Sequence, residues 1–200
     1  MQILKDDVRN RILDAAVQDI LAVGYLNSSL RRIAKQADIT VGNIYAYFKS
    51  KEALLDAILA PTLAELNNVI ENLSKGSNLQ TISWEALAND ITDVFLLNRE
   101  RFLILMTKCQ GSVYASAKKT LLVKIKGRIE QELLPSLPPL FQDEILAATI
   151  ATAAIDGLLT ILQQEHTTEA RVRQLVTAFI TILFANMQPT LTRKQENDYE

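Results

Sequence analysis

A short segment of the chain, residues 39–55, carries side chains suited to contacts with a polyanion. It reads ITVGNIYAYFKSKEALL. Asn43 offers a paired donor and acceptor that fit a base edge, and the hydroxyls of Tyr45 and Tyr47 can donate to phosphate oxygens. Lys51 adds an ammonium group in the first turn of an expected helix, beside backbone amides that also bind phosphate. These residue types predict contacts with nucleic acid.

Two short helices joined by a tight turn are expected to hold these side chains. Ser28 and Ser29 are natural N-cap residues, and they precede the helix-periodic run LRRIAKQA, residues 30–37. Thr40 caps a second helix that ends at about residue 47. The spacing is that of a helix-turn-helix, in which the second helix can enter the major groove of DNA.

The amino-terminal end of the second helix is the expected point of closest approach. Val41, Gly42 and Asn43 project from that end, and Gly42 leaves room for a close neighbour. Ile44 and Phe48 lie on the opposite face and are expected to pack in the core of the small domain.

The distribution of charge agrees with this assignment. The formal net charge of the 200 residues is only -2 at pH 7, yet residues 1–51 carry eight Lys and Arg against five Asp and Glu. The remainder carries 13 basic residues against 18 acidic ones. Only the first quarter of the chain is therefore expected to approach a polyanion.

Several function classes are excluded by the composition. Cys109 is the one cysteine and His166 the one histidine, which rules out an internal disulfide and a Cys/His metal cluster. No nucleophile with a nearby base and no phosphate-binding loop is visible, so neither an enzyme nor a cofactor is expected. Cys109 is interpreted as a buried hydrophobic residue, although a redox-sensing thiol stays open.

The expected location is the cytoplasm. The start of the chain, MQILKDDVRN, has acids where a signal peptide has a basic region. The apolar stretch 145–162 contains Asp156, and an acid near a helix centre costs about 2.5–3.5 kcal/mol on membrane-insertion scales. That stretch is therefore interpreted as a buried interface helix.

Helical periodicity dominates the chain, and strand signals are scarce, so the expected fold is all-α with about nine helices. The expected organisation is a three-helix helix-turn-helix DNA-binding domain at 1–50, a helical effector-binding and dimerisation domain at 51–188, and a polar tail at 189–200. The first helix is expected to stop at Gly24. A long helix is expected from about residue 51 to about Ser74, and Pro61 within it is a potential point for a kink or an early end. Further helices are expected at 83–98, 101–108, 116–134, 142–165 and 168–187.

The run SLRRIAKQADITVGNIYAYFKSKEALL resembles the N-terminal signature of the TetR family of bacterial transcriptional repressors. The resemblance covers about residues 8–55, and past residue 60 it rests on length and helix count. The matching positions are Ile33, Ala34, Ala37, Gly42, Tyr45, Tyr47, Phe48, Ser50, Lys51 and Glu52.

This resemblance implies specific DNA contacts. It implies phosphate binding by Ser29, Thr40, Tyr45, Tyr47 and Lys51, and base contacts by Arg31, Val41, Gly42 and Asn43. Arg32 stays open between a solvated position and a DNA contact.

The sequence departs from the family pattern at three positions in this region. Asp38 stands where the family usually has glycine in the turn, Ala46 stands where an aromatic is frequent, and Val41 is apolar where a polar residue is common. Val41 would favour contact with a thymine methyl group over a hydrogen bond.

The last two long helices are apolar around too much of their circumference for lone surface helices. Burial against a second copy, as an antiparallel four-helix interface with twofold symmetry, accounts for this pattern, and the resemblance implies the same homodimer. The expected interface residues are Ala151, Ala154, Gly157, Leu158, Ile161, Val176, Phe179, Ile180 and Leu183.

The middle helices correspond to the region where the family has its effector pocket. Methionine and aromatic residues suit an adaptable apolar site, although ordinary core packing is the favoured interpretation of each residue taken singly. The candidate residues are Trp84, Leu87, Ile91, Phe95, Phe102, Met106 and Tyr114.

Together these features favour a homodimeric repressor that leaves a palindromic, double-stranded operator when a small apolar or neutral effector binds. The alternative is a protein-interaction adaptor that keeps the fold but has weakened or lost DNA binding, for which Asp38, Val41 and Ala46 would be the reasons.

Overall fold

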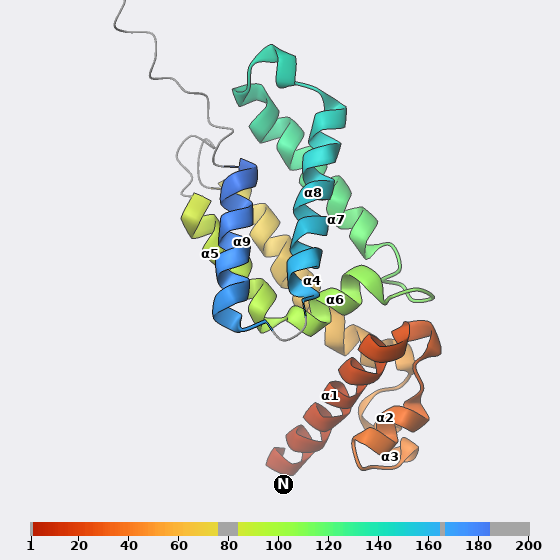
Figure 1. Cartoon of the computed structure of the whole chain (residues 1–200). Coiled ribbons are helices and arrows are strands. Elements are labelled where there is room, and N and C mark those ends of the chain that lie inside the picture. Colours follow the sequence, from red (N-terminus) through yellow and green to blue (C-terminus); the bar gives the residue numbers. More distant parts are fainter. Residues whose placement is uncertain (1, 76–83, 165–166, 185–200) are drawn as a thin grey trace, which may run out of the picture. The chain divides into compact units, whose positions relative to one another are not determined.

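A computed structural model of the chain describes residues 2–75, 84–164 and 167–184. Within these ranges the fold is all-α, as expected, with nine α-helices and no strand (Figure 1). The predicted polar tail at 189–200 and His166 lie outside the described residues. The helices are α1 Gln2–Asn27, α2 Leu30–Gln36, α3 Val41–Tyr47, α4 Lys51–Lys75, α5 Trp84–Leu97, α6 Arg99–Thr107, α7 Ala117–Arg128, α8 Glu144–Leu162 and α9 Glu169–Phe184.

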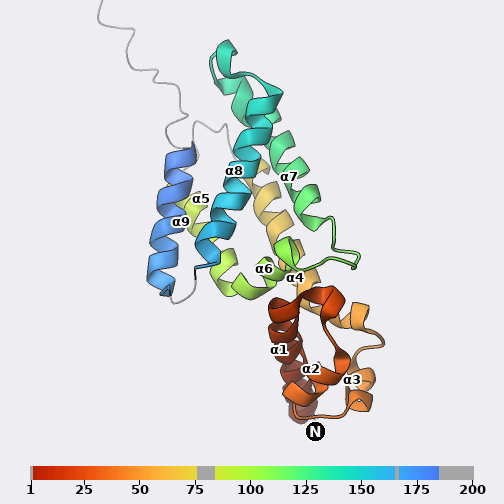
Figure 2. The same ribbon diagram turned by 45° about the vertical axis from the view of Figure 1, so that its right-hand side comes forward.

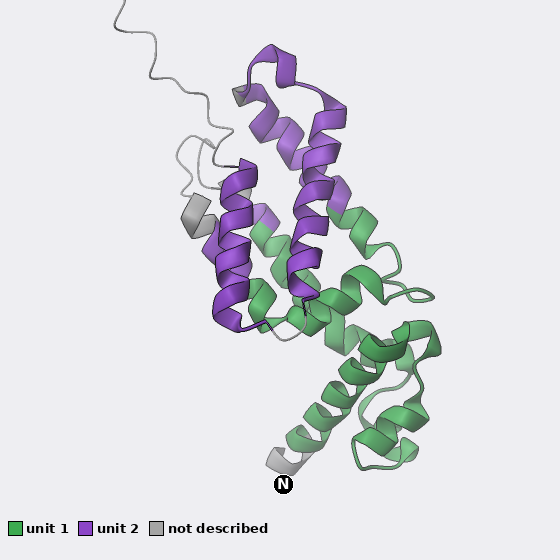
Figure 3. Cartoon of the chain, viewed as in Figure 1, with its two compact units in different colours: residues 1–69, 94–121 green, residues 70–93, 122–200 purple. Residues whose placement is uncertain are grey.

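The chain divides into two compact units (Figure 3). Unit 1 comprises residues 1–69 and 94–121, and unit 2 comprises residues 70–93 and 122–200. The helix-turn-helix thus shares unit 1 with the start of α4 and with α6. The division into domains at residue 50 stays a prediction.

Unit 1 holds α1, α2 and α3 against one another (Figures 1 and 2). Gly24 leaves the helical conformation near the end of α1, with φ 78° and ψ 158°, which confirms the expected stop. The following amide, Tyr25 N–H, donates to the carbonyl of Lys108 at 2.8 Å, so the end of α1 is tied to the end of α6. Fully buried side chains fill this unit, among them Ile12, Ile33, Ile44, Leu54 and Phe102.

α4 runs from Lys51 to Lys75, which confirms the expected end at about Ser74, and it passes through Pro61 without ending there; Pro61 is exposed, which leaves its ring clear of the core. One element differs from the expected helices. The helix expected at 116–134 stays α-helical only to Arg128, and then widens into a π turn, Ile129–Leu133, and a 3-10 turn, Leu134–Ser136.

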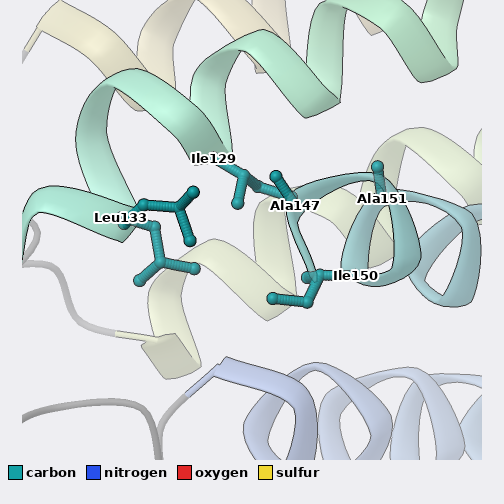
Figure 4. Close-up of a cluster of buried hydrophobic side chains, with 6 residues drawn as sticks. Ile129, Leu133, Ala147, Ile150 and Ala151 are labelled. Atoms are coloured by element: carbon teal, nitrogen blue, oxygen red, sulfur yellow. The ribbon is translucent and has the colours of Figure 1, made fainter. Parts of the chain in front are cut away.

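Unit 2 is built around α8. Ile129 and Leu133 from the π turn pack with Ala147, Ile150 and Ala151 of α8 (Figure 4). Asp143 caps the start of α8 by accepting from Ile145 N–H at 2.6 Å. α8 and α9 lie side by side and antiparallel, as both views show (Figures 1 and 2).

Two helical segments, Lys51–Glu71 and Glu144–Leu162, are long and apolar enough to cross a membrane by length and composition alone. Core helices of soluble proteins pass the same test. In α8, eight side chains from Ala147 to Leu162 are buried within the protein, which is the arrangement of a core helix.

Candidate nucleic-acid interface

The two short helices of unit 1 begin at the capping residues that the sequence predicts. The Ser29 hydroxyl oxygen accepts from Arg31 N–H at 3.3 Å, at the start of α2. The Thr40 hydroxyl oxygen accepts from Asn43 N–H at 3.2 Å, at the start of α3. Each bond satisfies one of the amides that a first helical turn leaves without a partner.

The turn between these helices accommodates Asp38 in place of the usual glycine. Asp38 has φ 53°, in the left-handed region that aspartate tolerates better than most residues. The turn is closed by Ile39 N–H, which donates to the Ala34 carbonyl at 3.0 Å. The departure at Asp38 therefore leaves the turn intact.

One face of α3 is buried and the other is exposed. Ile44 and Phe48 are 0% and 5% exposed, which confirms their predicted place in the core. Arg9 of α1 lies over the Phe48 ring, 5.7 Å from its centroid, and Arg11 donates from Nη1 to the Ala37 carbonyl at 3.1 Å. Arg9 thus links α1 to the end of α3, and Arg11 links α1 to the end of α2.

The predicted DNA-contacting residues lie on two helices that pack together, α2 and α3, at the N-caps of these helices, and, for Lys51, at the start of α4. Tyr45 is 55% exposed although it is a large aromatic residue. The exposed members of the set are Arg31, Thr40, Gly42, Asn43 and Tyr45, and the half-buried members are Ser29, Val41, Tyr47 and Lys51.

Lys51 has an additional role that the sequence did not indicate. Its Nζ donates to the Ser28 carbonyl at 2.8 Å and lies 4.4 Å from the centroid of the Tyr25 ring. Partial burial lowers the pKa of Lys51. An ammonium group has three N–H donors, so the contact with Ser28 positions Lys51 and leaves donors for a phosphate.

Tyr25 is placed by the same group of contacts. Its hydroxyl donates to Glu52 Oε1 at 2.8 Å. Burial, followed by this hydrogen bond, raises the pKa of Tyr25 to about 12, so the phenol is neutral at physiological pH. The hydrogen bond also contributes to lowering the pKa of Glu52, behind a backbone hydrogen bond.

A buried acid organises the start of α2. Asp19 of α1 is 3% exposed and accepts from Ser29 N–H at 3.0 Å and from Arg32 Nε at 2.7 Å. The hydrogen bond with Asp19 raises the pKa of Arg32. Sequence analysis left Arg32 open between a solvated position and a DNA contact, and it assigned no role to Asp19. The available signal was that Asp19 is the one polar residue on the apolar face of the first helix.

The candidate effector residues are not brought together as one observed site. Phe95 and Phe102 meet edge to face in unit 1, with ring centroids 4.4 Å apart. Met106 is also buried, and Tyr114 donates to Asp56 Oδ1 at 2.5 Å. Ile91 is half-buried and belongs to unit 2, and the side chains of Trp84 and Leu87 lie outside the described residues. The effector pocket stays a prediction.

Five of the nine predicted interface residues of α8 and α9 are buried within a single chain. Their exposed fractions run from 0% to 6%, so they have almost no surface left to bury against a second copy. Packing inside the protomer thus covers these five residues, and the interface between two copies stays a prediction. The five residues concerned are Ala151, Ala154, Leu158, Val176 and Ile180.

The remaining predicted interface residues are half-buried: Gly157, Ile161, Phe179 and Leu183. Gly157 faces the Phe179 ring so closely that a Cβ would lie 2.2 Å from Cζ. This contact joins α8 to α9 within one protomer. The exposed face of α8 instead carries Thr149, Thr152, Ala153, Asp156 and Thr160.

Cys109 is buried, in agreement with its interpretation as a core residue. Its thiol donates to the Ile104 carbonyl at 3.2 Å. Burial raises the pKa of Cys109 to about 11, which leaves little thiolate near neutral pH. These properties disfavour the redox-sensor alternative.

Comparison with known proteins identifies relatives of the helix-turn-helix segment. The family described as bacterial regulatory proteins, tetR family, matches residues 12–58. The fatty acid metabolism regulator protein of Bacillus subtilis is 34% identical over 101 residues, which are 50% of each chain. The chain thus matches about half the length of that relative. An uncharacterized helix-turn-helix-type transcriptional regulator of B. subtilis, YdgC, is 25% identical over 164 residues, covering 81% of this chain and 80% of YdgC.

The fold is similar to that of solved structures beyond the helix-turn-helix. The transcriptional regulator FadR from B. subtilis, in complex with stearoyl-CoA, has a TM-score of 0.58 and 22% identity. That similarity covers 88% of this chain and 97% of FadR. The relatives are regulators rather than enzymes. Residues 12–58 thus form a helix-turn-helix domain of the tetR family of bacterial regulatory proteins, and the chain as a whole shares the all-α fold of the solved regulators.

Proposed function

We propose that the chain is a homodimeric repressor that leaves a palindromic operator when a small apolar or neutral effector binds. The supporting observation is the exposed amino-terminal end of α3. There Thr40, Gly42 and Asn43 are open to solvent, while Ile44 of the same helix is fully buried. A polar end on a firmly packed short helix suits insertion into a groove.

In this proposal α3 enters the major groove and α2 crosses the DNA backbone. Asn43 reads a base edge through its amide, Val41 contacts a thymine methyl group, and Arg31 reads a second base. Gly42 allows the α3 backbone to approach the DNA closely. The phosphate ligands are Ser29, Thr40, Tyr45, Tyr47 and Lys51.

The dimer would place two such reading heads on one face of DNA, about 34–36 Å apart, which requires a palindromic site. We infer that the exposed faces of α8 and α9 form the contact between copies. Ile145 and Ile182 are large apolar residues on these helices, 77% and 71% exposed.

The effector is inferred to act from the helical body on the spacing of the two heads, as a coupling between two sites. Stearoyl-CoA is a suitable first probe because the structure of the similar regulator FadR contains it; its acyl chain is apolar but its CoA phosphates are anionic, so a neutral lipophilic compound is tested beside it. We also infer that the protein acts in the cytoplasm, where operator and effector are available.

Selection of duplexes from a random pool, followed by fluorescence anisotropy, tests this function. The unaltered chain should enrich a palindrome and bind it about 10³-fold or more tightly than an unrelated duplex, with affinity falling steeply as salt rises. Stearoyl-CoA or another lipophilic compound should release it. Failure of a folded dimer to enrich any duplex at low salt would contradict the proposal.

The adaptor alternative loses its main structural reason. Asp38 adopts the left-handed conformation that the turn needs, and both capping bonds are in place. Only Val41 and Ala46 remain as departures, and these alter which bases are preferred more than whether DNA can bind.

A further inference from the structure

We propose that Asp19 and Arg32 are a positioning pair for DNA recognition. Asp19 fixes the start of α2 and holds Arg32 away from the DNA, so that of the two adjacent arginines Arg31 is the one that reads the operator. The proposal rests on the proposed function, and neither Asp19 nor Arg32 belongs to the DNA-contacting set.

The carboxylate of Asp19 is engaged on both oxygens. Oδ1 accepts from Arg32 Nε at 2.7 Å, and Oδ2 accepts from Arg32 Nη2 at 3.1 Å and from Ser29 N–H at 3.0 Å. The fork of two parallel bonds is the strong, directional form of an arginine–carboxylate contact. A carboxylate that is 3% exposed needs such partners because an unpaired buried charge is costly.

The Arg32 guanidinium is engaged in hydrogen bonds within the protein through its Nε and Nη2 atoms. Besides the two bonds to Asp19, its Nη2 donates to the Asn27 carbonyl at 2.7 Å. The guanidinium therefore spans the end of α1 and the start of α2. Although the Arg32 side chain is 48% exposed, moving it to a phosphate would break contacts with a buried acid.

The pair acts on the residues that begin α2. The Asp19 carboxylate accepts a hydrogen bond from Ser29 N–H. The Ser29 hydroxyl oxygen in turn accepts from Arg31 N–H and so caps α2. The preceding residue, Ser28, accepts at its carbonyl from Lys51 Nζ of α4 at 2.8 Å. The segment Ser28–Ser29 before α2 is thus fixed by hydrogen bonds from α1 and from α4. Fixing it in the free protein reduces the ordering cost of DNA binding.

Replacement of the acid gives a test in which two explanations predict opposite signs. Asp19→Asn removes a negative charge from the basic first quarter of the chain and releases Arg32 from its ion pair with residue 19. If charge alone mattered, DNA would bind more tightly. If the pair positions α2, the Asp19→Asn chain should bind the selected duplex about tenfold more weakly, because the charged fork is lost. Tighter binding would overturn the proposal.

The salt dependence of Arg32→Gln gives a second, independent readout. A positioning role predicts about tenfold weaker binding with the parental slope of log affinity against log salt, whereas loss of a phosphate contact lowers that slope by about one. A slope reduced by about one would overturn the proposal. The variant that combines Asp19→Asn with Arg32→Gln should bind DNA no more weakly than the weaker of the two single variants, because both changes disrupt the same ion pair.

Arg128→Gln is the matched control, because Arg128 pairs with Glu132 at 2.6 Å in unit 2 and lies outside the DNA-contacting set. It should bind DNA like the parent. Circular dichroism and thermal melting establish folding before each titration. If Asp19→Asn does not fold, the salt dependence of Arg32→Gln tests the proposal alone, because the Arg32 side chain is half-exposed and its replacement disturbs the core less. Failure of the parent itself to bind would instead refute the proposed function.

Discussion

A chain carrying both Tyr47→Ala and Lys51→Ala is expected to bind the selected duplex about 100-fold more weakly than the unaltered chain. Each change removes a proposed phosphate ligand, and one charged hydrogen bond contributes about 1.5–3 kcal/mol. Removal of the Lys51 ammonium should also lower the slope of log affinity against log salt by about one. Fluorescence anisotropy at several salt concentrations measures both quantities.

Two further variants separate DNA contact from folding. Lys51 also donates to Ser28, so the double variant must first be shown to melt cooperatively. Tyr47→Phe removes only a hydroxyl and should weaken binding while leaving stability close to the parent's. Lys119→Ala, a loss of one exposed lysine on α7, should have no effect on affinity. A folded double variant with unchanged affinity would favour the adaptor.

Gly157→Val is expected to lower the free energy of unfolding by about 2–3 kcal/mol, through overpacking between α8 and α9. A Cβ at this position would lie 2.2 Å from Phe179 Cζ and 2.7 Å from Cε2, so the ring or the helices must move. In a protein of this size such a loss lowers the melting temperature by about 4–12 °C. Thermal melting followed by circular dichroism measures it.

Gly127 supplies the matched control for this prediction. It lies within α7, and a Cβ added there would meet nothing within 4 Å. Gly127→Ala should leave stability unchanged or raise it by up to about 1 kcal/mol, since alanine favours helix more than glycine does. An equal melting temperature for Gly157→Val and the parent would contradict the packing of α8 on α9.

The helix-turn-helix was predictable because its signals are local. Ser29 and Thr40 cap helices that start at the next residue, and the three-four spacing of Ile33, Ala34 and Ala37 marks the buried face. Capping and periodicity act within one or two helical turns. The turn at Asp38 could be expected for the same reason.

Contacts between distant residues were not predictable in this way. Periodicity indicates that a position is buried but not which residue covers it. Asp19 and Arg32 are far apart in sequence, and the bond from Tyr25 N–H to the Lys108 carbonyl joins segments that are farther apart still. Likewise, the apolar faces around Ala154 and Val176 indicated burial, and both residues are buried by packing within the protomer.

A further variant, Gly42→Ala, tests whether the amino-terminal end of α3 approaches DNA. In the free protein a Cβ at Gly42 would meet its nearest neighbour, Thr40 Oγ1, at 3.7 Å, an ordinary contact. Alanine should therefore leave the fold unchanged or slightly stabilise it, because it favours helix over glycine.

The most direct measurement is accordingly a comparison of melting temperature and operator affinity for Gly42→Ala and the parent. If α3 reads DNA from this end, the added methyl group occupies space that the duplex needs. The expected result is an equal or higher melting temperature together with about tenfold or greater loss of affinity for the selected duplex. Parental affinity in this variant would contradict the assignment of α3 as the reading helix.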